Sequence, residues 1–151
     1  MTELRYIDGI RTGLEAAMAA DERVTVLGED VTVGGPFTAT KGLFDRFGPR
    51  RVRDTPISEP TIVGMAIGAA LSGQRPVVEI MFIDFVTLAM DQLVNHAAKL
   101  RYMSGGQLHV PQVIRAQGGI SGSYGAHHSH SLEAWFTHIP GIKVVAPSTP
   151  A

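Results

Sequence analysis

Along this chain, stretches with helical periodicity alternate with short runs of β-branched residues, and this alternation constrains the fold more than any other feature. Apolar residues first recur at three- and four-residue spacing, typical of an amphipathic helix, at Ile7, Ile10, Leu14, Ala17 and Met18. The pattern then predicts strands at 24–28, 51–55, 76–82, 111–117 and 141–147, and helices near 40–48, 57–73, 85–106 and 131–139. Strands that alternate with helices pair in parallel, so we expect one α/β domain over residues 1–151, with a mainly parallel sheet flanked by helices.

Three segments lie at or just after the ends of predicted strands. They are "ISE" at 57–59, "MFIDF" at 81–85 and "GAHHSH" at 125–130. In sheets of this kind ligands bind at the carboxyl ends of the strands. We therefore expect these segments to share one functional edge.

The composition excludes several classes of function. With 13 basic and 14 acidic residues the net charge is −1, so no basic surface for nucleic acid or membrane is indicated. The chain has no cysteine, which removes thiolate catalysis and cysteine-based zinc sites. The start "MTELRYIDGI" lacks the pattern of a secretory signal, and no apolar run has membrane-spanning length. We expect a cytoplasmic protein.

The glycine-rich run "GGISGSYG" at 118–125 resembles a phosphate-binding loop only superficially. Its spacing fits neither G-x-G-x-x-G nor G-x-x-x-x-G-K-[ST]. We interpret it as a mobile loop, and predict that the chain carries no phosphate cradle of its own.

Three of the six histidines, His127, His128 and His130, lie within four positions. A zinc site needs three or four converging ligands, and no nearby Cys or Asp completes such a set, so no metal site is predicted. Two other readings stay open on local grounds. The segment is a polar turn with Ser131 as the N-cap of the next helix, or it carries an acid–base group, since imidazole titrates near neutrality.

Glu59 allows two interpretations. With Ser58 as N-cap and Pro60 in the first turn, it places a negative charge at the N-terminus of a helix, worth about 0.3–1 kcal/mol. It is also the acidic residue of a segment at the expected functional edge. Phe82 and Phe85, on their own, are typical of core aromatics.

Taken together, the segments resemble a known family. The series "GEDV", "GGPFTATKGLFDRFG", "RVRDTPISEPTIVGMAIGAALSGQRPVVEIMFIDF", "DQLVNHAAKLRYMSGG", "PQVIR" and "HHSHSLEAWFTHIPGIKVVAPSTP" is similar to the β subunit of the E1 component of 2-oxo acid dehydrogenase complexes. The resemblance covers this family's N-terminal, pyrimidine-binding domain, with a transketolase-like fold. The family's C-terminal domain is not expected within these residues.

The resemblance implies a thiamine diphosphate site. The Glu of the family's "SE" motif falls on Glu59, whose carboxyl would hydrogen-bond the aminopyrimidine ring and promote formation of the nucleophilic ylide. The aromatic of "MFIDF", Phe85, would pack on the pyrimidine face, with Ile57 and Met81 as apolar neighbours. Glu29 and Asp91 resemble members of a carboxylate path between paired sites.

The resemblance also chooses between the readings of the histidine turn. The His of the family's "QHSQ" turn falls on His128, which would handle protons while the acyl group passes to a lipoyl arm. His127 and His130 stand where the family often has Gln, so this turn carries two titratable side chains that the family pattern lacks.

A partner chain is implied as well. The family's Gly-Asp-Gly-type motif, which holds the diphosphate and its Mg²⁺, does not occur here and belongs to the α subunit. The expected assembly is an α2β2 heterotetramer that meets the lipoyl domain of the E2 acyltransferase. Gly64 and Gly68 would let helices cross tightly at a subunit interface.

For the substrate, "RYMSGG" and "DTPISE" favour pyruvate first and acetoin second over a branched-chain 2-oxo acid. Two other classes stay open. One is half of a transketolase-like synthase, and the other is a non-catalytic fragment that only takes part in assembly.

Overall fold

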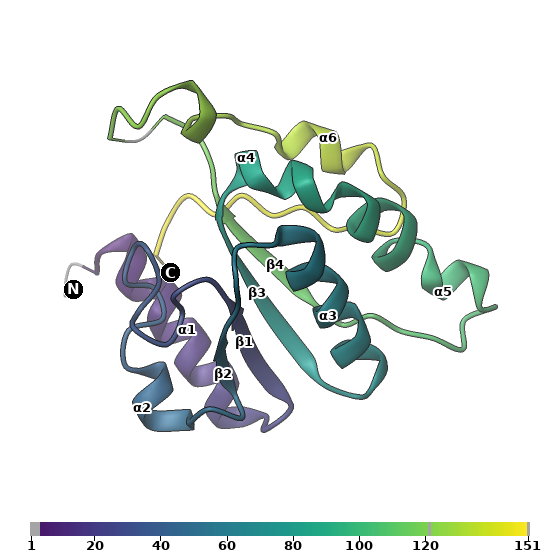
Figure 1. The fold of residues 1–151 in the computed structure, drawn as a ribbon, viewed down its shortest axis with the longest axis horizontal. Helices are drawn as coiled ribbons and strands as arrows, with labels where there is room; N and C mark the ends of the chain where they lie inside the picture. Colours follow the sequence, from purple (N-terminus) through teal and green to yellow (C-terminus); the bar gives the residue numbers. More distant parts are fainter. Residues whose placement is uncertain (1–3, 121, 151) are drawn as a thin grey trace.

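A parallel sheet of four strands in the order β2-β1-β3-β4 forms the centre of the computed structural model, which describes residues 4–120 and 122–150 (Figure 1). The start of the N-terminal stretch, Ser121 of the glycine-rich run and Ala151 lie outside the described residues. The strands are β1 (Val24–Gly28), β2 (Val52–Asp54), β3 (Arg75–Phe82) and β4 (Val113–Gln117). The helices are α1 (Tyr6–Ala20), α2 (Leu43–Phe47), α3 (Glu59–Leu71), α4 (Ile83–Val86), η1 (Thr87–Ala89), η2 (Gln92–Ala97), α5 (Leu100–Met103), η3 (Ala126–His128) and α6 (Glu133–Thr137). The predicted fold class, a parallel α/β sheet flanked by helices, is confirmed.

Both faces of the sheet are covered, and β1 shows this most clearly because all five of its residues are buried. Val24 and Val26 point to the side of α1 and α2, where they pack with Met18 and Leu43. Leu27 points the other way, into the cluster beneath α3. A strand covered on both faces reads as a continuous apolar run, which is why VTVLG lacks polar alternation.

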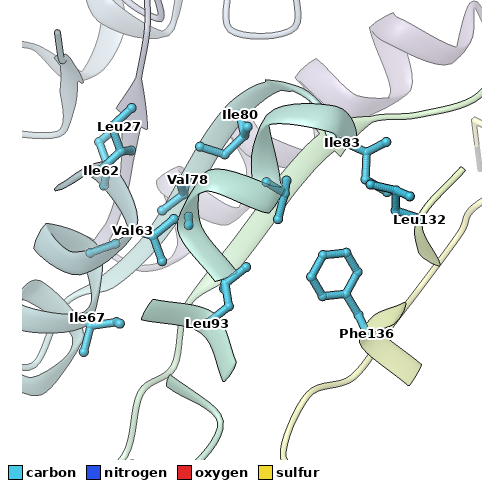
Figure 2. Close-up of a cluster of buried hydrophobic side chains, with 13 residues drawn as sticks. Leu27, Ile62, Val63, Ile67, Val78, Ile80, Ile83, Leu93, Leu132 and Phe136 are labelled. Carbon is cyan, nitrogen blue, oxygen red and sulfur yellow. The ribbon is translucent and has the colours of Figure 1, made fainter. Parts of the chain in front are cut away.

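The larger core cluster joins α3, the segment after β3, and α6 to the sheet (Figure 2). Burying each large aliphatic side chain contributes about 1.5–3 kcal/mol, so this cluster fixes α3 and α4 relative to β3. Its labelled members are Leu27, Ile62, Val63, Ile67, Val78, Ile80, Ile83, Leu93, Leu132 and Phe136. The start of α3 and the start of α4 are thereby held at the carboxyl edge of the sheet.

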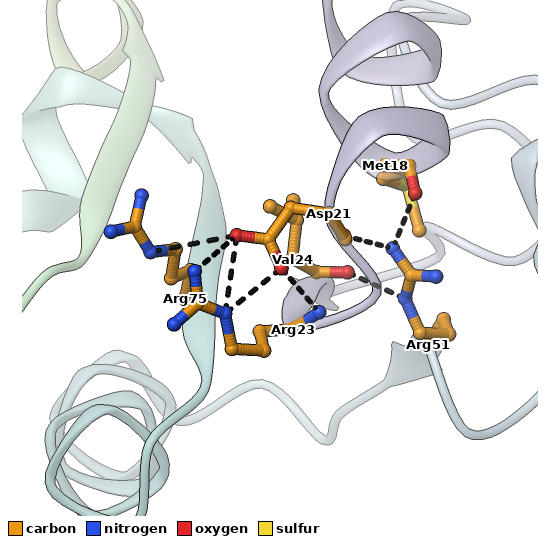
Figure 3. A network of polar contacts seen from close by, with 6 residues as sticks. All are labelled: Met18, Asp21, Arg23, Val24, Arg51 and Arg75. Atoms are coloured by element: carbon orange, nitrogen blue, oxygen red, sulfur yellow. Dashed lines mark hydrogen bonds and ion pairs between the residues drawn. The ribbon is translucent and has the colours of Figure 1, made fainter.

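A polar network closes the opposite, amino-terminal edge (Figure 3). Arg51 donates to the main-chain carbonyls of Met18, Asp21 and Val24 at 2.8, 2.9 and 2.7 Å, which satisfies acceptors near the C-terminus of α1. Hydrogen bonds from the Arg23 side chain and amide lower the pKa of Asp21 to about 2. This network joins α1, β1 and β2.

Glu79 of β3 and Arg115 of the adjacent strand β4 lie opposite each other and form a partly buried ion pair, with Arg115 Nε 2.7 Å from Glu79 Oε2. Burial raises the pKa of Glu79 more than the arginine lowers it. Gly28 lies opposite Glu79 on β1, and a Cβ there would stand 2.5 Å from the Glu79 carbonyl oxygen. Only glycine fits this approach of β1 to β3.

Three expected elements differ from the structure. The single helix predicted over 85–106 is a series of short α, 3-10 and π segments, α4 to α5. The strand predicted at 141–147 is absent; the segment passes back along the sheet with Ile142 and Val144 against the core and Val145 exposed, but without strand pairing (Figure 1). Helix α6 begins after Leu132, so Ser131 is not its N-cap.

None of the helices in the described ranges is both long enough and apolar enough to cross a bilayer.

Candidate functional site

The carboxyl ends of all four parallel strands meet at one edge, as the sequence predicted. Glu29 follows β1, Glu59 begins α3 after β2, and α4 begins directly after β3. The loop after β4 leads to η3, which contains His127 and His128. The segments "ISE", "MFIDF" and "GAHHSH" therefore lie at the same end of the sheet.

Glu59 is buried at this edge, with a relative exposure of 6%. It is the first residue of α3, Ser58 occupies the N-cap position, and Pro60 lies in the first turn, as expected. The Ser58 hydroxyl donates to Thr61 at 2.8 Å and makes no cap hydrogen bond. Within the described ranges no hydrogen bond to the Glu59 carboxyl is found. Glu59 has the position of a helix-terminal charge, and its side chain is largely buried, although its carboxyl oxygens are not among the fully buried atoms that lack a partner in the described ranges.

A second carboxyl group lies near Glu59. Burial, together with the negative charges of Glu59 and Asp30, raises the pKa of Glu29. Because neighbouring anions disfavour each other's ionisation, one proton at this edge is held more tightly than on a free carboxyl group. The carboxylate path between paired sites, in which the family resemblance placed Glu29 and Asp91, remains a prediction. Asp91, by contrast, has a side chain that is 61% exposed and accepts a hydrogen bond from Asn95 at 2.8 Å.

We expect Glu29→Gln to stabilise the protein at neutral pH. A raised pKa means that the folded state disfavours the carboxylate, so this destabilisation is present above the folded-state pKa and disappears below the unfolded-state value. The midpoint of thermal unfolding should be higher than that of the parent at pH 7, and the difference should shrink near pH 4. Glu22→Gln, at an exposed position, is the matched control. A lower midpoint at pH 7 would contradict the interpretation.

An aromatic cluster lies at the same carboxyl edge of the sheet, and Phe82 is its centre. Its ring meets those of Phe37, Phe85, Tyr124 and His128 edge-on at centroid distances of 5.5, 5.9, 6.0 and 4.6 Å. Edge-to-face contacts of this kind contribute about 0.5–1.5 kcal/mol beyond burial. Phe82 is buried, as expected of a core aromatic, but its central place in this cluster was not predicted; the cofactor contact that the resemblance gave to Phe85 stays a prediction.

His128 is half-buried against this cluster, with its ring 5.3 Å from Phe85 as well. His127 and His130 are exposed residues that do not share its aromatic contacts. The His130 ring instead binds Asp84, a buried residue of α4 to which the sequence pattern assigned no role. Among the described residues, no group of three or more His, Asp or Glu side chains is arranged to hold a metal.

The remaining predicted site residues, Met81 and Ile57, lie at the same edge but differ in solvent exposure. Met81 is half-buried at the end of β3, next to a bulge that shifts the pairing with β4. Ile57 is 80% exposed just before α3. The roles given to Ile57, Met81, Phe85, Glu59 and His128 remain predictions.

A parallel sheet with its polar residues at the carboxyl ends of the strands is typical of α/β domains that bind ligands at that edge. The chain matches the family described as "Transketolase, pyrimidine binding domain" over residues 2–151, and it belongs to that family.

The curated relatives are more specific. The chain is 49% identical to the pyruvate dehydrogenase E1 component subunit beta of Gracilaria tenuistipitata var. liui, covering 99% of this chain and 47% of the relative. It is 48% identical to the 2-oxoisovalerate dehydrogenase subunit beta of Bacillus subtilis (strain 168), covering 99% of this chain and 46% of the relative. The resemblance to E1 β subunits is confirmed, and the chain spans less than half the length of these relatives.

A solved structure supports the fold. The chain of a split gene transketolase, described as an inactive beta4 tetramer, matches with a TM-score of 0.67 at 18% identity, covering 92% of this chain and 41% of that one.

Proposed function

We propose that this chain is the pyrimidine-binding part of an E1 β subunit, which acts in thiamine-diphosphate-dependent oxidative decarboxylation of a 2-oxo acid with acyl transfer to lipoamide. The observation that supports this proposal most is the largely buried Glu59 at the carboxyl edge of the sheet, where the aromatic cluster also lies, in a member of the transketolase pyrimidine-binding family.

The residues at the edge fit one end of this cofactor. The carboxyl group of Glu59, on a largely buried side chain, is suited to bind a ring nitrogen, and Ile57, Met81 and Phe85 are apolar side chains suited to a flat heterocycle. When bound, thiamine diphosphate supplies a nucleophilic carbon and an electron sink for decarboxylation. Glu59 would hold a proton at its carboxyl oxygen toward the pyrimidine, and burial of the site would keep water away from that hydrogen bond.

A partner chain is needed to complete the site. Large apolar side chains are exposed after every strand of the sheet, and a surface of this kind marks an interface. They are Val33 after β1, Ile57 after β2, Leu88 after β3, and Ile120 and Tyr124 after β4, with exposures of 80, 80, 57, 96 and 54%. We propose that an E1 α subunit covers this edge, brings the Mg²⁺ and diphosphate site, and forms an α2β2 heterotetramer with the β chain.

His128 would serve the second half of the reaction. Its half-buried ring, fixed against Phe82 and Phe85, is an acid–base group at the same edge as Glu59. We assign it proton handling while the acyl group passes to the lipoyl domain of the E2 acyltransferase.

Pyruvate is the proposed substrate, and acetoin or a branched-chain 2-oxo acid is the alternative. The relatives named above carry different substrates at 49 and 48% identity, so similarity alone does not separate them. A panel of pyruvate, acetoin and 2-oxoisovalerate, compared by kcat/KM, decides the point.

The experiment is reconstitution with an α subunit in the presence of thiamine diphosphate and Mg²⁺. Two assays follow the reaction: substrate-dependent reduction of an artificial electron acceptor reports decarboxylation, and acylation of a lipoyl domain reports the complete sequence. Both activities should require both chains. If the chains assemble but bind no cofactor, the chain is a non-catalytic fragment that only takes part in assembly. Ketol transfer without lipoyl acylation would identify half of a transketolase-like synthase instead.

A further inference from the structure

Asp84 is a buried carboxylate that the proposed function does not use. Its side chain is 6% exposed in α4, and Oδ2 is buried without a hydrogen-bond partner in the described part of the chain. Burial opposes ionisation, but hydrogen bonds from the His130 ring and from the backbone amides of Asp84 and His130 outweigh it, so the pKa of Asp84 lies below its usual range. A buried anion of this kind needs a close donor, and His130 provides it.

His130 connects three parts of the fold. Its Nδ1 contacts Asp84 Oδ1 on α4, and its main-chain carbonyl accepts a hydrogen bond from the Gly119 amide at 2.7 Å, just after β4. The junction is tightly packed, because a Cβ on Gly118 would lie 3.2 Å from the Ile83 side chain and 3.4 Å from the His130 carbonyl. The loop that carries the histidines is therefore fixed at His130.

The segment 82–85, which runs from the end of β3 into α4, also holds His128. Phe82 and Phe85, on either side of Asp84 in the sequence, meet the His128 ring edge-on at 4.6 and 5.3 Å. These edge-to-face ring contacts depend on where the backbone of the histidine loop lies. Two residues after His128, the contact of His130 with Asp84 holds that backbone. The same segment therefore holds His128 by ring packing and His130 by a hydrogen bond to a carboxylate.

We propose that His130, through its contact with Asp84, is a positioning residue that fixes the His128 ring for acyl transfer to the lipoyl group. The inference rests on the proposed function and assigns the task to a position where the E1 β family often has Gln. What the contact requires is an N–H donor of suitable length, and a neutral imidazole or a carboxamide supplies one. Charge on His130 is not required.

The test compares His130→Ala with His130→Gln in the reconstituted enzyme. His130→Ala should lower lipoyl acylation about tenfold, since small misplacement of a catalytic group is costly, while acceptor reduction changes by less than about twofold. His130→Gln should keep lipoyl acylation within about threefold of the parent, because it retains a donor. His109→Ala, an exposed histidine outside the turn, is the matched control.

A second measurement does not depend on activity. Carbethoxylation of His128 by diethyl pyrocarbonate, followed by mass spectrometry, should be several-fold faster in His130→Ala and return to the parent rate in His130→Gln. An unchanged His128 rate, or equal loss in both assays, overturns the positioning role. If the parent enzyme lacks 2-oxo acid activity but His130→Ala still speeds the carbethoxylation of His128, the proposed function fails, while the positioning of the His128 ring by His130 stands.

Discussion

Replacing Glu59 by Gln in the reconstituted enzyme should lower 2-oxo acid-dependent acceptor reduction by ~100-fold or more. Gln keeps the shape of the side chain and removes the carboxyl proton, and a positioned acid or base contributes about 10²–10⁴-fold to a rate. The residue is 6% exposed and has no internal partner, so the substitution removes chemistry without breaking a packing contact. Steady-state rates with saturating cofactor give the readout.

The fold of the Gln variant should be unchanged by circular dichroism, because a neutral amide at the first helical position costs only the helix-dipole interaction, about 0.3–1 kcal/mol. Glu22→Gln, an exposed carboxyl just before β1, controls for the loss of one negative charge. If Glu59→Gln turns over at the parent rate, the carboxyl serves only the helix terminus and the cofactor assignment is wrong.

Much of the fold follows from local sequence. β1 and β3 were predicted with bounds close to those observed, because continuous β-branched runs covered on both faces have no competing helical pattern. α3 was predicted from its N-cap and proline despite its two internal glycines. In the structure Gly68 faces open space, which is compatible with the predicted interface on this helix.

The predicted elements that differ from the structure are those whose secondary structure depends on tertiary contacts. The apolar run at 141–147 was predicted to be a strand; Ile142 and Val144 do pack against the core, but pairing requires a free and aligned strand edge, which local pattern does not encode. Likewise the helical pattern over 85–106 does not reveal its division into 3-10 and π segments.

At the candidate site, the rule that ligands bind at the carboxyl ends of parallel strands is enough to place Glu59, Phe85 and His128 at one edge. It does not reveal the central position of Phe82 or the contact between Asp84 and His130, since residues 46 positions apart meet only through the sheet. Local sequence also did not predict that Glu29 lies near Glu59; the raised pKa of Glu29 reports this proximity, while the carboxylate path between paired sites stays a prediction.

Replacing His128 by Ala should lower lipoyl acylation by ~100-fold while acceptor reduction falls by less than about fivefold. The ring is half-buried against Phe82 and Phe85, so its position is defined, and the artificial acceptor bypasses the step that needs its proton. The ratio of the two rates, measured in one preparation, removes errors in enzyme concentration.

His127→Ala provides the matched control, because His127 is adjacent in η3 but exposed and without the aromatic contacts of its neighbour. If acid–base chemistry belongs to the ring that the aromatic cluster orients, only the His128 variant should change the ratio. Equal effects of the two substitutions would mean that the turn contributes shape or charge rather than one oriented imidazole. A larger effect at His127 would move the catalytic assignment by one residue and leave the aromatic cluster as core packing.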